Sequence, residues 1–157
     1  MIPLVSILIP FYNEEKNILK ALESCLNQSY GNIEIILVDD FSTDSSVENI
    51  KVVTDSRVKL LQSSNKGVGF ARNTAMKSAK GDFFAFLDAD DELHREFVSI
   101  SLNEIQEKKC DIAVFGSRVF DRNKNEIRKS INNTNFEVLS GTDALKMLYK
   151  HAIIASV

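Results

Sequence analysis

The sequence contains little cysteine, no long apolar run and no excess of basic charge. Its two cysteines, Cys25 and Cys110, have no cysteine or histidine nearby at ligand spacing, which excludes a zinc ribbon and a disulfide scaffold. No apolar run reaches the roughly 18 residues that span a bilayer, and no basic region precedes an apolar stretch at the amino terminus. The net charge of −3 provides no general attraction for nucleic acid. We therefore expect a cytoplasmic protein with no nucleic-acid partner and no transmembrane segment in this chain.

The sequence does contain enough apolar material for a packed core. Of its 157 residues, 44% are hydrophobic and 26% are charged, as is typical of one ordinary globular domain. A chain of this size buries roughly 68–70% of the surface that its unfolded form exposes, so it needs no disulfide to fold.

Strand-like and helix-like segments alternate from the amino terminus onward. This alternation predicts an α/β fold with a mainly parallel sheet. The spacing of Ile18, Leu22 and Cys25 places this cysteine on the buried face of a helix. The predicted strands are Val5–Ile9, Ile33–Val38, Val58–Leu61, Phe83–Leu87 and Ile112–Phe115, and Pro10 is expected to end the first of them. Three predicted helices are Glu15–Gln28, Phe70–Ala79 and His94–Lys108. A further predicted helix is capped by Ser42, Thr43 and Asp44 and ends near Thr54.

The pattern changes after residue 117. Arg118–Phe120 and Glu126–Arg128 flank a polar stretch that is typical of a hairpin turn, which predicts a small antiparallel addition. Ser140–Asp143 supplies caps for a helix that ends near Tyr149, and an apolar segment follows it. We therefore expect the chain to divide into residues 1–117 and residues 118–157.

Polar residues follow three of the predicted strands. In an open parallel sheet the carboxyl ends of the strands meet at one edge, where ligands bind. The residues that follow the first, second and fourth strands are, in that order, Pro10, Tyr12, Asn13 and Glu14, then Asp39 and Asp40, then Asp88, Asp90 and Asp91. Tyr12 either stacks on a nucleobase or covers the end of the sheet. Asp40 either accepts hydrogen bonds from a base or ribose or caps the next turn.

A glycine-rich turn precedes the third predicted helix. Gly67 and Gly69 resemble half of a dinucleotide fingerprint, but no third glycine follows and no first strand precedes them, so a Rossmann cofactor site is not favoured. The two glycines instead give the backbone room beside a ligand. Arg72 either faces a pyrophosphate, pairs with one of the converging acids or forms a surface salt bridge.

The acidic group Asp88–Asp91 is the sharpest feature of the sequence. Carboxylates this close repel one another, and a divalent cation such as Mn²⁺ or Mg²⁺ relieves the repulsion. Such an ion is held by one or two carboxylates while substrate phosphates complete its shell, which fits a nucleoside diphosphate. The alternative is that these acids only cap the helix that begins near His94.

Other kinds of protein also carry clustered aspartates or bind nucleotides. An EF-hand is excluded because its sixth position would be Leu93 instead of glycine and its twelfth Ser99 instead of glutamate. A magnesium-dependent phosphatase that forms an aspartyl intermediate stays an alternative, although such enzymes carry their paired aspartates on the first strand. A non-catalytic module that binds a sugar nucleotide is a further alternative.

Four segments together resemble one known family, the nucleotide-sugar-dependent glycosyltransferases of family 2, which have the GT-A fold. Val5–Glu14 resembles the opening segment of that family, Leu37–Asp44 its second signature and Gly67–Asn73 its third, and Asp88–Asp91 matches its metal motif. Phe41 stands where the family usually has glycine. The resemblance implies a Rossmann-like three-layer α/β/α sandwich. It also implies that residues 1–117 form the donor-binding and metal-binding core and that residues 118–157 begin an acceptor-side region.

The resemblance also implies roles for individual residues. Asp88 would contact the ribose or sugar, and Asp90 would ligate the metal that bridges the diphosphate. Both would stabilise the donor and its leaving group, and so act in catalysis. The donor-binding residues implied in this way are Pro10, Tyr12, Glu14, Asp40, Gly67, Arg72, Asp88 and Ala89.

The implied activity is inverting transfer of a sugar from a nucleoside-diphosphate sugar, with UDP favoured, to a saccharide or lipid-linked acceptor. The product would be a polysaccharide, glycolipid or cell-surface glycan. The cytoplasm, including the inner face of the membrane, is the expected location, which leaves room for peripheral membrane association of the full protein. Inversion needs a carboxylate base, and Glu126, Glu137 and Asp143 do not lie in a recognisable base motif, so we expect the base outside this chain.

Overall fold

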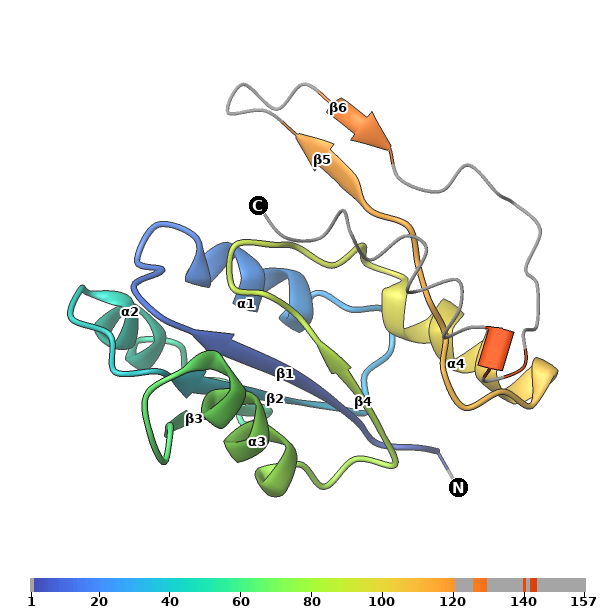
Figure 1. Cartoon of the computed structure of the whole chain (residues 1–157), viewed down its shortest axis with the longest axis horizontal. Helices are drawn as coiled ribbons and strands as arrows, with labels where there is room; N and C mark the ends of the chain where they lie inside the picture. The colour runs from blue at the N-terminus through green and yellow to red at the C-terminus, as the bar shows by residue number, and fades with distance from the viewer. Residues whose placement is uncertain (1, 121–125, 130–139, 141, 144–157) are drawn as a thin grey trace. The chain divides into compact units, whose positions relative to one another are not determined.

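Four parallel strands form the central sheet. The computed structural model describes residues 2–120, 126–129, 140 and 142–143. The strands β1 (Val5–Phe11), β2 (Ile33–Asp39), β3 (Val58–Gln62) and β4 (Phe83–Phe86) lie in the order β3-β2-β1-β4 (Figure 1). The predicted parallel sheet is therefore confirmed. The chain divides into two compact units, Met1–Ser101, which contains this sheet, and Leu102–Val157.

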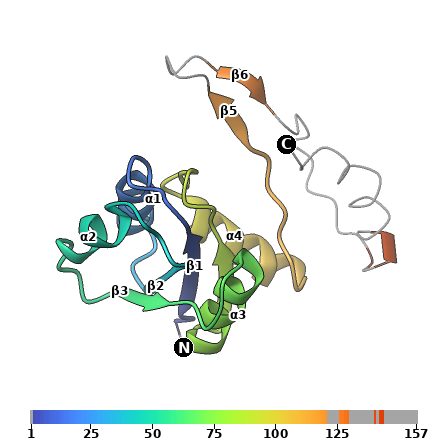
Figure 2. The ribbon, with the colours of Figure 1, turned by 60° about the vertical axis from the view of Figure 1, so that its left-hand side comes forward.

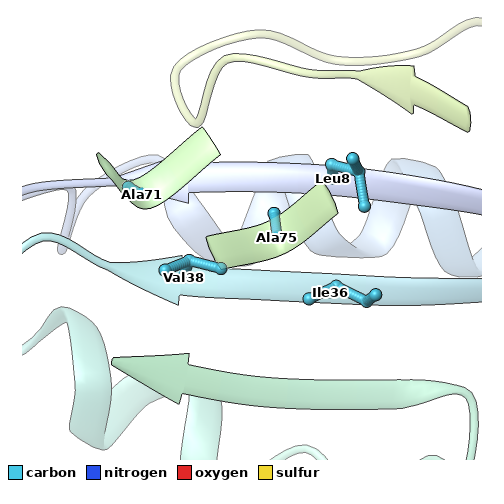
Figure 3. Packing of buried hydrophobic residues seen from close by; sticks show 5 residues of the cluster. All are labelled: Leu8, Ile36, Val38, Ala71 and Ala75. Atoms are coloured by element: carbon cyan, nitrogen blue, oxygen red, sulfur yellow. The ribbon is translucent and has the colours of Figure 1, made fainter. Parts of the chain in front are cut away.

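Helices cover both faces of the sheet. On one face, α3 (Val68–Ser78) packs Ala71 and Ala75 against Leu8, Ile36 and Val38, as Figure 3 shows. These two small side chains bring the helix close to the strands. The other helices are α1 (Ile18–Leu26), α2 (Ser46–Lys51) and α4 (Phe97–Lys108), of which α1 and α2 lie on the opposite face of the sheet from α3 (Figure 2).

The central strands are apolar because both of their faces are covered. Every residue of β1 is buried, and in β2 only Glu34 is partly exposed. Side chains alternate between the faces, so Ile7, Ile9 and Leu37 point away from α3. Cys25 of α1 is fully buried, as its helical spacing predicted. Burial raises the pKa of the Cys25 thiol to about 12, so this thiol stays protonated.

Gln28 joins the end of α1 to the start of α4. Its Nε2 donates to the carbonyl oxygens of Ser24, at 3.1 Å, and His94, at 2.9 Å, and its Oε1 accepts from the Val98 N–H at 3.0 Å. The segment that follows the Asp88–Asp91 group is therefore fixed to α1 through one buried amide side chain.

Pro10 does not end the first strand, contrary to the prediction. β1 continues to Phe11, and Pro10 is in register with Val38 of β2. The last pair between β1 and β4 is Leu8 with Phe86, and the Leu87 N–H donates to the Leu8 carbonyl oxygen. The backbone N–H and C=O groups of every second strand residue point to the same neighbouring strand, so those of Leu8 and the C=O of Pro10 point toward β4. Because β4 has ended before it reaches Pro10, the missing N–H of Pro10 removes no hydrogen bond between strands.

The strand predicted at Ile112–Phe115 is wrong. Residues 112–117 have no regular secondary structure and pair with no strand within the described part of the chain, and Ile112 is 77% exposed. An apolar run adopts a strand only where a neighbouring strand completes its hydrogen bonds. The helix predicted at Glu15–Gln28 is shorter, because Glu14–Asn17 forms a turn and α1 begins at Ile18.

The predicted hairpin is confirmed. β5 (Arg118–Phe120) and β6 (Glu126–Lys129) pair antiparallel, with Arg118 opposite Lys129. The final predicted helix, up to Tyr149, lies outside the described residues except for Thr142 and Asp143, which are helical. No helix among the residues described here combines the length and the apolar character that crossing a bilayer requires.

Candidate functional site at the carboxyl edge of the sheet

The loops after β1 and β2 are joined by a set of hydrogen bonds. Asn13 has a φ of 54°, a left-handed conformation that asparagine tolerates better than most residues. Its backbone N–H donates to Ser42 Oγ at 3.0 Å, and its Oδ1 accepts from the Thr43 N–H at 2.8 Å. The Glu14 N–H donates to Ser46 Oγ at 2.8 Å. The two predicted site loops are therefore one hydrogen-bonded structure.

Tyr12 and Glu14 lie in this joined structure. The Tyr12 side chain is 55% exposed and has no hydrogen-bond partner among the described residues, so its ring is free to meet a ligand. Glu14 is partly buried, and its Oε2 accepts from Asn17 Nδ2 at 2.9 Å. Pro10 is buried inside β1, and Phe11 separates it from the loop that begins at Tyr12.

Asp44 also belongs to this structure. Its Oδ1 accepts from the Ser46 N–H at 2.9 Å and its Oδ2 from the Glu15 N–H at 3.0 Å. Desolvation raises the pKa of Asp44, but the hydrogen bonds from Ser46 and Glu15 outweigh it and hold that pKa below its ordinary value. The capping role predicted for this residue agrees with these contacts.

Asp40 connects the end of β2 to the start of α3. Both of its carboxylate oxygens lie close to the Gly67 N–H, Oδ1 at 2.7 Å and Oδ2 at 3.0 Å. Gly67 has a φ of 116°, which L side chains rarely adopt, so a glycine is required here. The neighbouring Asp39 is buried, and its Oδ1 accepts from the Ser42 N–H at 2.9 Å.

A second contact joins the same two loops. The Lys66 Nζ lies 5.9 Å from the centre of the Phe41 ring, within the range of a cation–π interaction. Phe41 has a φ of 64°, which explains why a glycine suits this position better than a bulky residue. The sequence signalled the unusual residue at position 41, but not its contact with Lys66.

Arg72 and Asp88 bring α3 and the loop after β4 together. The Arg72 Nη2 donates to Asp88 Oδ1 at 3.1 Å, and the Arg72 guanidinium lies 5.9 Å from the centre of the Phe86 ring. Of the three roles open to Arg72, the structure contains the pairing with a converging acid. The Asp88 side chain is 60% exposed, so this pair is accessible from solvent.

The remaining acids stand at the surface beside this pair. Asp90 and Asp91 are exposed, whereas Ala89 between Asp88 and Asp90 is 5% exposed and anchors the loop. Partial desolvation, and then the negative charges of Asp90 and Asp88, raise the pKa of Asp91. A cation bound nearby would offset this repulsion and favour the ionised form of the carboxylate.

The donor set suits Mn²⁺ or Mg²⁺ but is incomplete by itself. Hard divalent cations prefer carboxylate oxygens, which Asp88, Asp90 and Asp91 provide. Within the described residues no three histidine, cysteine or acidic side chains are placed to hold a metal ion together. The arrangement fits an ion held by one or two carboxylates, with phosphate oxygens of a ligand supplying the other positions.

Two of the acids considered as general bases have polar partners close to them in the sequence. Glu126 Oε2 lies 3.9 Å from the Arg118 Nε, and Ser140 Oγ donates to Asp143 Oδ2 at 2.7 Å. Glu137 lies outside the described residues. Sequence reasoning placed Asn13 after the first strand and gave Ser42 a capping role, but it did not predict that the two residues bond to each other, because that bond depends on a contact between two loops.

Comparison with known proteins agrees with this geometry. Residues 6–156 match the family model described as glycosyl transferase family 2. An uncharacterized glycosyltransferase of Haemophilus influenzae is 46% identical over 104 residues, which are 64% of this chain and 42% of that protein. The UDP-Glc:alpha-D-GlcNAc-diphosphoundecaprenol beta-1,3-glucosyltransferase WfgD of Escherichia coli is 47% identical over 89 residues, 56% of this chain and 35% of that protein.

Two solved structures are similar as well. TarS 1–349 of S. aureus in complex with UDP has a TM-score of 0.62 and 32% identity, over 66% of this chain and 32% of that one. The mannosyltransferase PcManGT of Pyrobaculum calidifontis, in complex with GDP-Man and Mn²⁺, has a TM-score of 0.62 and 26% identity, over 76% of this chain and 36% of that one. The chain spans less than half the length of each of these relatives.

Proposed function

The chain belongs to glycosyl transferase family 2, and we propose from this premise that its carboxyl edge binds a nucleoside-diphosphate sugar for transfer to an acceptor hydroxyl. The observation that carries the proposal is the pairing of Arg72 with Asp88, because it places a guanidinium and a group of exposed carboxylates beside the joined loops. UDP is the favoured nucleotide, since TarS was solved with UDP and WfgD is named for UDP-Glc.

The joined loops would hold the base and ribose. Tyr12 offers an exposed ring for stacking on a base. Asp40 accepts from Gly67 with both oxygens, yet a carboxylate has about four lone-pair sites, so it keeps capacity for a base or ribose donor. Pro10 and Glu14 shape the loop, while Gly67 and Ala89 let the backbone approach the ligand. These donor-binding roles belong to the proposed core of residues 1–117.

Asp88 and Asp90 would act at the diphosphate and the sugar. Asp90 is exposed and unpaired in the described part of the chain, so we assign it as a ligand of Mn²⁺ or Mg²⁺. PcManGT was solved with Mn²⁺, which supports this assignment. When bound, such an ion neutralises charge that grows on the phosphate oxygens of the leaving group. Arg72 adds a fixed positive charge near the same oxygens, and Asp88 orients Arg72 and reaches the ribose or sugar.

The transfer itself needs one more group. An inverting reaction requires a base that takes the proton from the acceptor hydroxyl as it attacks the sugar carbon. We place this base outside the chain, with residues 118–157 leading toward the acceptor side. A saccharide or a lipid-linked saccharide is the proposed acceptor, as the name of WfgD includes a diphosphoundecaprenol-linked sugar. The cytoplasm, at the inner membrane face, is the corresponding location.

Thermal unfolding with nucleoside diphosphates tests the donor site. Mn²⁺ together with UDP should raise the unfolding temperature, because a ligand at 100 times its dissociation constant adds about 2.7 kcal/mol to stability. GDP and ADP serve as the competing nucleotides. Asp90→Ala should remove the dependence on Mn²⁺, and Asp111→Ala, which changes another exposed aspartate, should keep it. Failure of every nucleotide to stabilise the chain would contradict the proposal.

Hydrolysis assays separate the phosphatase alternative. A magnesium-dependent phosphatase would release phosphate from small esters through a covalent aspartyl intermediate, and Asp88→Asn would abolish that release. We expect no such release, because Asp88 is engaged by Arg72 and stabilises a donor instead of attacking one.

A further inference from the structure

A positively charged surface runs along the outer side of β3 and α3. Residues 56–81 include six basic residues and no aspartate or glutamate, although the whole chain has a net charge of −3. β3 is an edge strand of the sheet, and α3 follows it in the chain. The two elements line a shallow groove to which Lys59, Phe70, Thr74, Lys77, Ser78 and Lys80 contribute. We call this surface the basic flank.

The lysines of the basic flank have no acidic partners. Arg57 pairs with Asp55 and Arg72 pairs with Asp88, so these two charges are balanced. Lys59 donates from Nζ to Ser78 Oγ at 2.6 Å, a neutral acceptor that leaves its charge uncompensated. Lys77 and Lys80 form no ion pair within the described residues and are exposed.

An aromatic side chain is exposed among these lysines. Phe70 lines the groove beside Lys59 and Lys77 and is 47% exposed. It is exposed because α3 buries only Ala71 and Ala75 against the sheet. Phe70 and Lys77 are seven residues apart, which places them on one stripe of the helix, two turns from each other.

We propose that the basic flank is a docking surface for a membrane that contains anionic lipids. Lysine ammonium groups meet lipid phosphates while their aliphatic stems rest on apolar surface, and aromatic and aliphatic side chains enter the headgroup layer. The flank combines both features. A free phosphate ligand shares the attraction to the lysines but gains nothing from the exposed ring of Phe70, so the combination of lysines with this ring favours the lipid source.

The position of the flank is compatible with an active carboxyl edge. α3 begins at the carboxyl edge beside Asp40 and Gly67 and runs back toward the amino ends of the strands. Lys59 is in register with Ile36, in the middle of β2, and Lys80 follows α3 next to the start of β4. Lys59 and Lys80 therefore lie away from the loops with Asp88 and Asp90. Figures 1 and 2 show the course of β3 and α3 along the sheet. The proposal goes beyond the donor site and does not depend on it.

Sedimentation with lipid vesicles tests the proposal. The chain should bind vesicles of equal parts phosphatidylglycerol and phosphatidylcholine and not vesicles of phosphatidylcholine alone. The triple variant Lys59→Gln, Lys77→Gln, Lys80→Gln should bind about 100-fold more weakly, since each lysine near an anionic surface contributes about fivefold. The matched control is Lys16→Gln, Lys20→Gln, Lys51→Gln, which removes the same charge from exposed positions before and in α1 and in α2 and should bind like the unchanged chain.

Further arms distinguish lipid from other anions. Phe70→Ser should weaken vesicle binding while it leaves binding of inorganic polyphosphate unchanged, and unchanged thermal unfolding confirms that each variant is folded. An equal loss of vesicle binding in the two triple variants would overturn the proposal, and so would a failure of the unchanged chain to bind anionic vesicles. Binding of polyphosphate or RNA without binding of vesicles would also overturn it, in favour of a soluble polyanion. The nucleotide experiment on the donor site is independent, so either proposal can fail alone.

Discussion

Phe41 shows how one residue carries a conformational cost at the proposed site. Its φ of 64° lies in the left-handed region, where a side chain with a Cβ costs about 1–2 kcal/mol. The ring is partly buried and lies near the Lys66 Nζ, which offsets part of that cost. The loop after β2 thus keeps its shape in spite of the residue at this position, because the hydrogen bonds of Asp39 and Asp40 hold both sides of it.

Two substitutions separate the backbone strain from the ring contact. Phe41→Ala and Phe41→Gly both remove the ring, but only glycine relieves the strain. We expect the glycine variant to be more stable than the alanine variant by about 0.5–1 kcal/mol in urea denaturation, after allowing for the flexibility of glycine in the unfolded chain. At Thr54, which lacks a positive φ, the order should reverse. An alanine variant at least as stable as the glycine variant at position 41 would contradict this account.

The ion pair of Asp55 and Arg57 makes stability depend on pH. Asp55 accepts hydrogen bonds from the Arg57 side chain at 3.0 and 2.9 Å and from its backbone N–H at 2.9 Å, and these bonds lower the pKa of Asp55 to about 2. The unfolded value is about 3.9. The ionised form is favoured by folding, so its contribution is complete well above pH 4 and is lost as the pH falls toward 2.

The corresponding variant is Asp55→Asn. Urea denaturation at several pH values should find this variant less stable than the unchanged chain at neutral pH, with the difference shrinking below about pH 4. Asp111→Asn, at an exposed aspartate without a hydrogen bond to Arg57, serves as the control. A difference that stays constant down to acid pH would show that the Asp55 charge is not the cause.

At the scale of elements, the turn from α3 into β4 depends on close packing at the amino edge of the sheet. The buried Ser6 Oγ donates to Glu34 Oε1 at 2.6 Å and accepts from the Gly81 N–H at 2.9 Å. The Lys80 N–H donates to the same Glu34 oxygen at 2.6 Å. These contacts connect β1, β2 and the start of β4, so they set where the acidic loop at the other end of β4 begins.

Gly81 is the narrowest point of this packing. A Cβ at this position would lie 2.6 Å from Ser6 Oγ and 2.7 Å from the Phe83 carbonyl oxygen. Gly81→Ala should therefore cost about 1–3 kcal/mol of stability, measured by urea denaturation. Gly31→Ala is the control, since nothing lies within 4 Å of its added Cβ and the change should be nearly neutral. Equal stability of the two variants would mean that the turn shifts without cost.

At the scale of the whole molecule, stability should be unevenly distributed. β1 pairs with β2 and with β4 and is buried along its length, whereas β5 pairs only with β6 within the described residues and is exposed. A two-stranded hairpin is marginal by itself. We therefore expect the central strands to be more stable than the hairpin of β5 and β6.

Native-state hydrogen exchange measures this distribution. Backbone amides of β1 and β2 should exchange at the rate of global unfolding, and their exchange should respond strongly to denaturant. Amides of β5 and β6 should exchange much faster and respond little to denaturant. Equal protection of the hairpin and of β1 would mean that the two units unfold together.

The sequence by itself determined the alternation of strands and helices, the parallel sheet and the order of the loops at its carboxyl edge. These features follow from the periodicity of apolar residues and from the alternation of strand and helix segments, both of which can be read from short stretches of the sequence. The buried position of Cys25 and the short hairpin from Arg118 also followed from local patterns. The proposed donor site was foreseen as a set of residues, because parallel strands must end at one edge.

Only the tertiary structure decided which of these residues meet. Several acids were possible partners for Arg72, and in the structure it pairs with Asp88. Asp40 accepts a hydrogen bond from Gly67, which lies 27 residues further along the chain. β1 continues through Pro10 because its neighbour β4 has already ended, and residues 112–117 stay irregular because no described strand pairs with them. Each of these outcomes depends on a partner that is distant in sequence, and local patterns contain no information about such a partner.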